Sequence, residues 1–358
     1  MLDNAQDATL SAKQVDVVLT LAQDGFGQNG AETITLSGYC IHCQITSTGL
    51  ESGMACTLRV EGLAQPLLNQ LSVLQTGMAA QTRNTVTILA GQSTGQGAGQ
   101  KPVVFHGGVV EAFVDYANSP DVAFELRAFS GALPAAVPVA PTSFAQDVPV
   151  VTIMQLLAAK AGLDFTNYGV QTLLRGGVYY KGSVAEQVDS CARAARIAYQ
   201  IGVGALAIWP GAMVAQADAQ AIRVNVQTGL VGYPSYSQYG VVFQTVFNPS
   251  IRYRDTVCLQ TGTAALAAQP TSPQTVAGQQ PAQGALTQGA LTQGISTQGQ
   301  SGQGQGQGAR ASGVMVPASG LWVVQNVRHD LQTERPGGAW FTTVEAARPD
   351  FAGQAFAR

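Results

Sequence analysis

Short runs of alternating apolar and polar residues fill the first third of the sequence, and this pattern limits the fold more than any other feature. Val15–Leu19, Thr33–Leu36, Cys56–Val60 and Thr85–Leu89 repeat with the period of two that places successive side chains on opposite faces of a strand. Gly-rich turns separate these runs between residues 13 and 130. The pattern predicts several short strands folded into a β-barrel or a β-sandwich.

One segment of this region has helical spacing instead. Between Ala64 and Leu74, apolar residues fall on one helical face behind Pro66, a residue that the first turn of a helix tolerates. We expect one short helix here, lined by Leu67, Leu68, Leu71 and Leu74. Two further strands are expected at residues 103–113 and 122–128, and Pro134, Pro138 and Pro141 then mark a boundary.

The period changes to helical between Val151 and Pro210. Strands at Val178–Tyr180 and Ala205–Trp209 accompany two helices, which predicts a small α+β unit. The first helix is expected to bury Val151, Met154, Leu157 and Ala158, and the second Val184, Val188, Cys191, Ala194 and Ala195.

A second β-rich region begins near Ile222 and ends in two strands, at residues 320–331 and 338–346, that predict a hairpin with Pro336–Gly338 in its turn. The chain is therefore expected to be mainly β with an α+β insert. Its domains are predicted at residues 1–133 (first β-domain with one inserted helix), 142–215 (α+β) and 216–358 (second β-region, interrupted by a loop at 261–313).

The loop at 261–313 belongs to a longer stretch, residues 256–309, that contains no charged side chain. Tandem pentads begin at Gly284 and read Gly-Ala-Leu-Thr-Gln twice and then Gly-Ile-Ser-Thr-Gln, before a Gly-Gln run. Such a sequence buries too little apolar surface to offset its chain entropy, so alone it should be flexible. Its neutrality leaves two alternatives open: simple disorder, or ordering against another protein of an assembly.

Charge is scarce throughout the chain. Only 11% of the 358 residues are charged, against about 25% in an average soluble domain, while 46% are hydrophobic. Burial between subunits would explain this deficit. The net charge of −3 excludes the basic surface expected of a protein that neutralises many phosphates.

The five cysteines, an odd number, form no disulfide framework for a chain of this length, so reduced and mostly buried thiols are expected. They are Cys40, Cys43, Cys56, Cys191 and Cys258. Residues 1–7 lack the basic and apolar parts of a signal peptide, and no apolar run reaches the length of a membrane span. We expect folding in the cytoplasm and no stable membrane insertion.

The strongest metal-like signal is Cys40-Ile41-His42-Cys43, with Cys56 downstream. A zinc site needs four converging ligands, and here a second pair is missing. Strand alternation would place Cys40 and His42 on one face and Ile41 and Cys43 on the other. We expect an ordinary strand and no metal or cofactor.

Catalytic patterns are weak. The three histidines, His42, His106 and His329, each lie in an alternating strand pattern, and no G-x-S-x-G motif occurs. Glycoside hydrolysis uses a pair of carboxylates, for which Glu186 and Asp189 are candidates. Both fall on the polar side of a predicted helix. We predict no catalytic residue and a protein that is not an enzyme.

A glycine pattern at Gly25–Gly30 superficially matches the dinucleotide-binding motif G-x-G-x-x-G. The motif requires a helix directly after the glycines to hold a pyrophosphate, but Thr33–Leu36 is a predicted strand. No cofactor-binding site is expected there.

Several segments resemble patterns found in phage baseplate hub proteins. Gly229–Tyr236 and Gly240–Ile251 correspond to the family's "GYP" turn and "GV…LFNP" strand, and residues 254–259 to its "G-x-x-V" strand, with Arg254-Asp255 in place of the usual glycine. Residues 321–331 and Pro336–Trp340 look like the closing "W-x-V-x-x-V-x-H-x-L…PGG-x-W" hairpin. With the Phe105–Gly108 strand, the resemblance covers most of the chain except the Gln/Gly-rich loop.

The resemblance implies two related β-barrel domains separated by small α/β domains, in a homotrimer whose six barrels dock on a hexameric tail tube while the other end presents threefold symmetry to a spike. It implies a structural virion protein of the tail or baseplate, assembled in the host cytoplasm, with roles in tail assembly and genome delivery. The implied partners are the tail tube or distal tail protein, the central spike protein and other baseplate subunits, with the tape measure protein as a further candidate. DNA would pass through without sequence-specific binding.

Two alternatives stay open. One is a tail-associated cell-wall hydrolase, which would require a catalytic site that the sequence does not reveal. The other is a tail-tip carbohydrate-binding protein, suggested by the aromatic residues Tyr233, Tyr236, Tyr239 and Trp322.

Overall fold

The computed structural model describes residues 12–21, 32–50, 53–71, 84–92, 101–117, 122–136, 138–212, 215, 220–237, 240–261 and 318–348. Residues 262–317, which contain nearly all of the Gln/Gly-rich loop, lie outside the described residues, so both alternatives for that loop stay predictions. None of the helices in the described ranges has the length and apolar character needed to cross a bilayer.

The first β-region follows the predicted alternation, because its strands bury every second side chain. The helix predicted between Ala64 and Leu74 is present and begins at Gln65, with Pro66 in its first turn, although Leu74 lies outside the described residues. The elements of this region are β1 (Lys13–Thr20), β2 (Thr33–Leu36), β3 (Cys40–Leu50), β4 (Gly53–Glu61), α1 (Gln65–Leu71), β5 (Thr85–Gln92), β6 (Val103–Asp115) and β7 (Ala123–Phe129).

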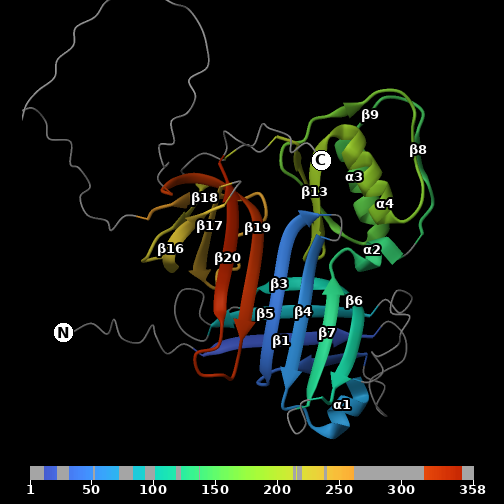
Figure 1. Ribbon diagram of the computed structural model, residues 1–358. Helices are drawn as coiled ribbons and strands as arrows, with labels where there is room; N and C mark the ends of the chain where they lie inside the picture. The colour runs from blue at the N-terminus through green and yellow to red at the C-terminus, as the bar shows by residue number, and fades with distance from the viewer. Residues whose placement is uncertain are drawn as a thin grey trace, which may run out of the picture. The chain divides into compact units, whose positions relative to one another are not determined.

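These strands are neighbours in the order β3-β4-β7-β6-β5-β1-β2, with every pair antiparallel. In Figure 1, β1 and β5 run across the direction of β3, β4 and β7, so the sheet folds over on itself. Apolar side chains from both sets of strands, among them Leu19, Ile45, Leu58, Ile88 and Phe124, form one core between them.

Strand β6 makes the turn from one set to the other. Its first half pairs with β5, as far as Gly107 opposite Val86 and Gly108 opposite Thr85, and its second half pairs with β7 from Gly108 opposite Phe129 onward. A Cβ atom on Gly107 would lie 2.6 Å from the Phe129 carbonyl oxygen, so only glycine fits there. The Gly107–Gly108 pair of the quoted motif therefore permits the bend.

The α+β unit has the predicted helices and strands. Its three-stranded sheet pairs β10 with β14 in parallel and β13 with β14 antiparallel. The elements are α2 (Ala132–Ala136), β8 (Thr142–Phe144), β9 (Val148–Pro149), α3 (Val150–Ala161), β10 (Asp164–Asn167), β11 (Leu173–Leu174), β12 (Val178–Tyr180), α4 (Val184–Ala195), β13 (Ile197–Gly202) and β14 (Ala205–Pro210).

Helix α4 begins at a capping box, in which the Ser183 hydroxyl accepts from the Glu186 N–H and the Glu186 carboxylate accepts from the Ser183 N–H. The predicted buried faces need two corrections. Ala194 is exposed and Ala192 is buried in its place, and Val151 of α3 is only partly buried, whereas Ile153 is fully buried. Both errors are shifts of a position or two around a helix, within the width of an apolar face.

The last β-region contains the predicted hairpin. Gln332 N–H donates to the Ala339 carbonyl and Gly338 N–H to the Arg335 carbonyl, so the Pro336–Gly338 segment forms the turn. The "GYP" segment is a bulge within β16 rather than a separate turn, because the register with β17 shifts between Val231 and Ser235. The elements are β15 (Ile222–Val224), β16 (Leu230–Tyr236), β17 (Gly240–Val246), β18 (Thr256–Leu259), β19 (Gly320–Gln332) and β20 (Trp340–Ala347).

Strand β19 joins the two β-regions. Its first half pairs with β18, where Thr256 lies opposite Val323, and its second half pairs with β3, where Gln332 lies opposite His42. One sheet therefore runs from β16 through β17, β20 and β19 into β3 and on to β2. Within the described residues this path is open at both ends and closes into no ring, so the chain is mainly β as predicted, but two barrels are not confirmed.

The two tryptophans of the last hairpin, Trp322 on β19 and Trp340 on β20, lie in different hydrophobic cores. Because both lie in the paired strands of one predicted hairpin, the sequence predicts that they pack in the same core. Both are buried, but Trp322 packs among β16–β19 residues such as Phe243 and Val257, whereas Trp340 packs into the core of the first region with Leu331. The expectation of one core is wrong, because β19 and β20 are long enough to cross from one core to the other. The predicted domain boundaries stay a prediction.

Two sets of contacts attach the α+β unit to the sheet. The buried Ser130 hydroxyl accepts from Met54 N–H and donates to the Ile201 carbonyl of β13, which links the start of β4 to the unit. On the other side, the Trp209 ring at the end of β14 meets the Tyr253 ring edge to face, with centroids 5.6 Å apart. Each β-region thus has its own contact with the α+β unit.

Candidate functional site

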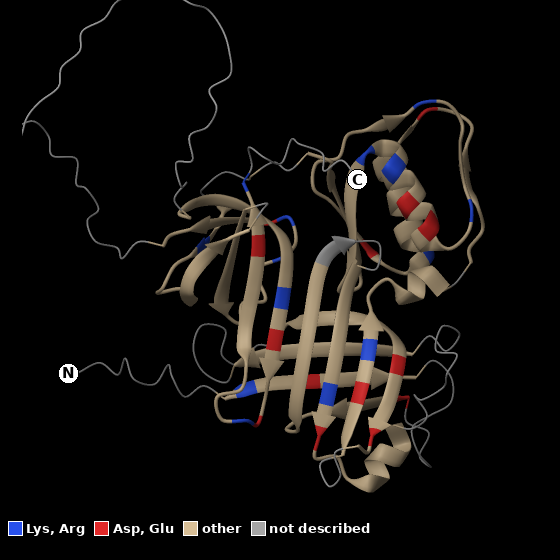
Figure 2. Cartoon of the chain, viewed as in Figure 1, with Lys and Arg blue, Asp and Glu red and all other residues tan. Residues whose placement is uncertain are grey.

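Charged side chains gather on strands β4, β6 and β7, as the red and blue bands in Figure 2 show. Because Leu58, Val60 and Leu126 face the core, the alternating residues between them face outward. Charged bands also lie on β19, β20 and α4 (Figure 2), and on the outer face of β4, β7 and β6 the charged side chains are linked by ion pairs.

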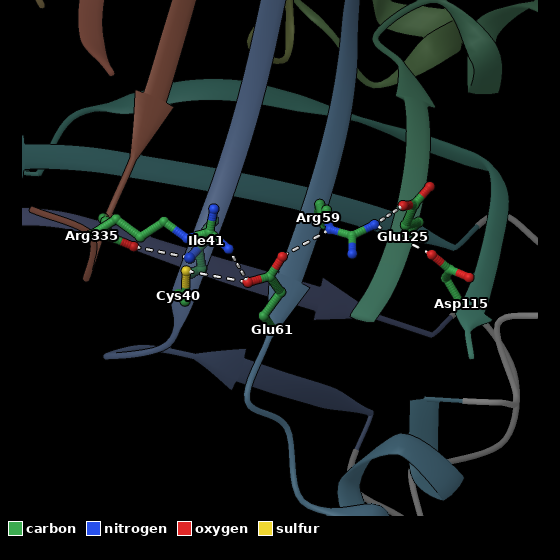
Figure 3. A network of polar contacts seen from close by, with 8 residues as sticks. Cys40, Ile41, Arg59, Glu61, Asp115, Glu125 and Arg335 are labelled. Carbon is green, nitrogen blue, oxygen red and sulfur yellow. Dashed lines mark hydrogen bonds and ion pairs between the residues drawn. The ribbon is translucent and has the colours of Figure 1, made fainter. Parts of the chain in front are cut away.

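Arg59 is the centre of this face (Figure 3). Its Nε lies 3.0 Å from Glu61 Oε1, and its Nη1 lies 2.5 Å from Glu125 Oε1 and 3.4 Å from Asp115 Oδ2. Strand pairing produces this arrangement, since Arg59 lies directly opposite Glu125 in the β4–β7 register. Three carboxylates thus surround one guanidinium group.

Glu61 extends the network toward the turn of the last hairpin. Arg335 Nη2 lies 2.6 Å from Glu61 Oε2, and the Cys40 thiol donates to the same oxygen at 3.7 Å (Figure 3). The hydrogen bond from Arg59, and then the one from Arg335, hold the pKa of Glu61 below its usual value. The same pairing with Glu61 raises the pKa of Arg59.

We name Arg59, Glu61, Asp115, Glu125 and Arg335 the paired-charge face; its two arginines and three carboxylates are linked by ion pairs and leave a formal charge of −1. Half-exposed ion pairs of this kind stabilise a fold little, typically by about 0–1 kcal/mol each. Its two arginines are already bound to carboxylates, so they are poorly placed to hold a phosphate. The paired-charge face is therefore compatible with exposure to water without binding of nucleic acid.

The three histidines lie apart in the fold. His42 Nε2 is 3.0 Å from Asp330 Oδ1 near the paired-charge face, His106 Nδ1 is 2.8 Å from Thr87 Oγ1, and His329 Nδ1 is 2.9 Å from Thr342 Oγ1. Each is a hydrogen-bonded strand residue, as predicted. Burial lowers the pKa of His106 and lowers that of His329 to about 4.

The cysteine cluster divides between two faces as alternation predicted. Cys43 is buried, with its sulfur 3.8 Å from the Cys56 sulfur, whereas Cys40 and His42 are partly exposed on the outer face. Among the residues that the structure describes, no group of three or more His, Cys, Asp and Glu side chains could hold a metal ion.

Glu186 and Asp189 both line a groove of about 1210 Å³ between β6, α2 and α4. Both carboxylates make local contacts on their own helix, because Glu186 belongs to the capping box and Asp189 pairs with Arg193 one turn later. The predicted polar side of the helix is therefore observed, and each acid has a structural role.

A node of three distant segments lies where the two β-regions meet. The Phe247 ring meets His329 and Trp340 edge to face, with centroid distances of 5.4 and 5.1 Å. Thr342 completes the node, since its hydroxyl accepts from Asn248 N–H at 2.9 Å and also contacts His329. The quoted "FNP", "H-x-L" and "PGG-x-W" motifs therefore meet in one place and hold the sheet together.

The model of the family described as baseplate hub gp41 matches residues 14–262. The chain belongs to this family. The chain is thus a member of a structural group of phage tail proteins, and membership implies a place in the tail of the virion.

Solved structures show the same fold at low identity. The 43 kDa tail protein of prophage MuSo2 from Shewanella oneidensis is 9% identical, with a TM-score of 0.51 over 94% of this chain and 99% of that one. The tail protein from Neisseria meningitidis MC58 is 7% identical, with a TM-score of 0.52 over 95% and 98%. No curated protein matches the sequence.

The resemblance to hub proteins also explains the backbone conformation of Arg254, which the sequence did not reveal. Arg254 stands at the glycine of the "G-x-x-V" pattern and has a φ of 70°, a conformation that glycine adopts without cost. Its guanidinium reaches the Ala212 and Pro210 carbonyls at 3.2 and 3.5 Å, next to the α+β unit. The following strand, β18, lies parallel to β15 and antiparallel to β19.

Within the described ranges the hub sheet has three edge strands, which sequence patterns could not identify. β2 pairs only with β1 and β16 only with β17 at the ends of the main strand path, and β15 pairs only with β18 beside that path. On β16, Tyr233 is 73% exposed and Val231 and Tyr236 are also exposed. Aromatic side chains on an uncovered edge strand are typical of surfaces that another chain covers.

Proposed function

We propose that this chain is a subunit of a homotrimeric baseplate hub that joins the tail tube to the central spike and takes part in tail assembly and genome delivery. The observation that carries the proposal is the open sheet of a hub-family chain, whose main strand path ends in edge strands β2 and β16. Uncovered edges favour pairing with another chain.

A ring supplies partners for both ends of the sheet. In a cyclic oligomer with head-to-tail contacts, one surface of each subunit meets a different surface of the next, and the contacts close after a fixed number of copies. In this proposal each β-region acts as one of two barrel-like repeats, so that three subunits present six repeats to the tube. The separate cores of the two β-regions support this reading.

The paired-charge face is proposed to border the channel of the ring. Genomic DNA would pass it without sequence-specific binding, because Arg59 and Arg335 are held by Glu61 and Glu125. The proposed partners are the tube or distal tail protein, the spike protein, other baseplate subunits and the tape measure protein, all met in the virion after assembly in the host cytoplasm.

The hydrolase alternative is less well supported. Its best carboxylates, Glu186 and Asp189, are engaged in contacts on their own helix. Zymography with purified protein on peptidoglycan separates the two readings, since a lytic zone would require catalysis.

Native mass spectrometry tests the proposal directly, with the full chain alone and after mixing with its tube and spike proteins. A trimer under at least the second condition is expected. A chain that stays strictly monomeric with both partners present would overturn the hub reading. Electron microscopy of intact particles should then place the chain between the tube and the spike.

A further inference from the structure

A cavity of about 340 Å³ lies where the α+β unit and the two β-regions meet. Its volume falls within the range of small-molecule sites, roughly 300–1,000 Å³. Strands β3, β10, β13 and β19 and the loop before β18 contribute polar lining residues, namely Ser47, Thr166, Tyr168, Gln200, Asp255 and His329.

His329 offers an unpaired donor to this cavity. The residue is only 6% exposed, and its Nδ1 is engaged with the Thr342 hydroxyl. We assign the tautomer in which the Thr342 hydroxyl, which accepts from Asn248 N–H, donates to Nδ1, so that the imidazole proton lies on Nε2. Among the described residues Nε2 has no hydrogen-bond partner.

Asp255 offers an acceptor on the other side. One carboxylate oxygen, Oδ2, accepts from Arg252 N–H at 2.8 Å, and Oδ1 has no partner in the described part of the chain. Burial raises the pKa of this carboxyl group. A ligand hydroxyl would satisfy Oδ1 and would favour the ionised form.

The remaining wall is mostly apolar and combines aliphatic residues such as Val103 and Ile251 with aromatic rings. Tyr168 stacks on Trp209 with centroids 5.0 Å apart and ring planes 1° from parallel, which holds the tyrosine ring in place. Tyr168 is 47% exposed, so part of its ring stays open to the cavity it lines. A flat apolar face beside separate donors and acceptors matches a sugar ring, which has C–H groups on its faces and hydroxyls around its edge.

We propose that this cavity binds a neutral saccharide of one or two rings, stacked on Tyr168 and hydrogen-bonded to Asp255 and His329. Opposite charges at Arg252 and Asp255 disfavour a strongly charged ligand of either sign. This site is independent of the hub role, since the residues that carry it lie away from edge strands β2 and β16.

Titration calorimetry on the full-length protein tests the site, with glucose, galactose and N-acetylglucosamine as probes and glucose 6-phosphate as the charged comparison. At least one neutral sugar should bind with a Kd of about 1 mM or below. No heat from any neutral sugar, or tighter binding of the phosphate, would overturn the proposal.

Four variants locate the binding. Tyr168→Ala and Asp255→Asn should each weaken it about tenfold or more, since each loses one principal contact. Tyr168→Phe, which keeps the stacked ring, should bind nearly as well as the wild type. Tyr179→Ala, at a tyrosine outside the cavity that is 63% exposed, is the matched control.

Thermal unfolding of each variant shows whether it is folded. If Asp255→Asn is not folded, the binding result for Tyr168→Ala alone tests the site. Equal binding by Tyr168→Ala and Tyr179→Ala would contradict the site. Trimer formation by the same variants reports separately on the hub proposal.

Discussion

The imidazole of His329 lies 2.9 Å from the hydroxyl of Thr342, across the β19–β20 pair, and the residue is buried. The same ring meets Phe247, so one buried histidine connects β19, β20 and the loop after β17. This node makes the stability of the sheet sensitive to the protonation of one side chain.

We expect acid to destabilise the protein through His329. Burial lowers its folded-state pKa to about 4, against about 6.5 when unfolded. Between these values the unfolded state binds a proton that the folded state does not, so this contribution is complete above pH 6.5 and is lost as pH falls toward 4. The free energy of unfolding should drop by roughly 1–2 kcal/mol from pH 7 to pH 5.

Urea unfolding at both pH values measures this drop. His329→Asn keeps a polar group near Thr342 but cannot titrate, so its drop over the same interval should be smaller. An equal drop in the variant and the wild type would assign the acid sensitivity to other groups.

Gly107→Ala should destabilise the first β-region. Its Cβ would lie 2.6 Å from the Phe129 carbonyl oxygen and 2.8 Å from the Phe105 ring, and neither can move without disturbing the sheet. The expected loss is about 1–3 kcal/mol, typical of overpacking. Gly177→Ala is the matched control, because its nearest contact would be 3.6 Å, and it should change the unfolding midpoint little.

The two buried tryptophans should differ in their response to phenylalanine. Trp322 Nε1 donates to the Ala318 carbonyl at 2.8 Å, whereas Trp340 Nε1 is buried with no partner among the described residues. Trp322→Phe therefore loses a hydrogen bond and Trp340→Phe loses none, which should make the first costlier by about 1 kcal/mol. Each tryptophan replaced by alanine should cost about 3–5 kcal/mol.

Denaturant unfolding of both phenylalanine variants decides this point. If Trp340→Phe lowered the free energy of unfolding more than Trp322→Phe does, the result would contradict an indole N–H without a partner at Trp340.

Arg254 should tolerate glycine better than alanine. Both substitutions remove the contacts to the Pro210 and Ala212 carbonyls, but only glycine is free of the penalty at a φ of 70°. That penalty is roughly 1–2 kcal/mol for a residue with a side chain. Melting temperatures should rank Arg254→Gly above Arg254→Ala, and the reverse order would contradict the strain at this position.

Tyr233→Lys should disturb assembly without unfolding the subunit. The residue is 73% exposed on edge strand β16, so its replacement should change stability by less than about 0.5 kcal/mol. A buried lysine in a subunit contact would be costly, and the trimer fraction in native mass spectra should fall. Tyr179→Lys, at a tyrosine 63% exposed on β12, is the control. An unchanged trimer fraction in Tyr233→Lys would show that β16 takes no part in the subunit contact.

Local patterns in the sequence were enough to predict most of the individual helices and strands. Period-two alternation predicted the strands of both β-regions, helical spacing predicted α1, α3 and α4, and the Pro336–Gly338 turn predicted the last hairpin. These features depend on residues close together in the chain, because alternation alone settles which side of a strand meets a core. The division of Cys40 and Cys43 between two faces followed for the same reason.

Which strands are neighbours could not be predicted from local patterns and became clear from the tertiary structure. β19 joins both regions, His42 contacts Asp330 across 288 residues, and Arg335 pairs with Glu61 across 274. The left-handed conformation of Arg254 and the cavity between Tyr168, Asp255 and His329 arise from those same long-range pairings. Alternation specifies which face of a strand is buried but not the partner beside it, because partner choice depends on packing among segments that are far apart in sequence.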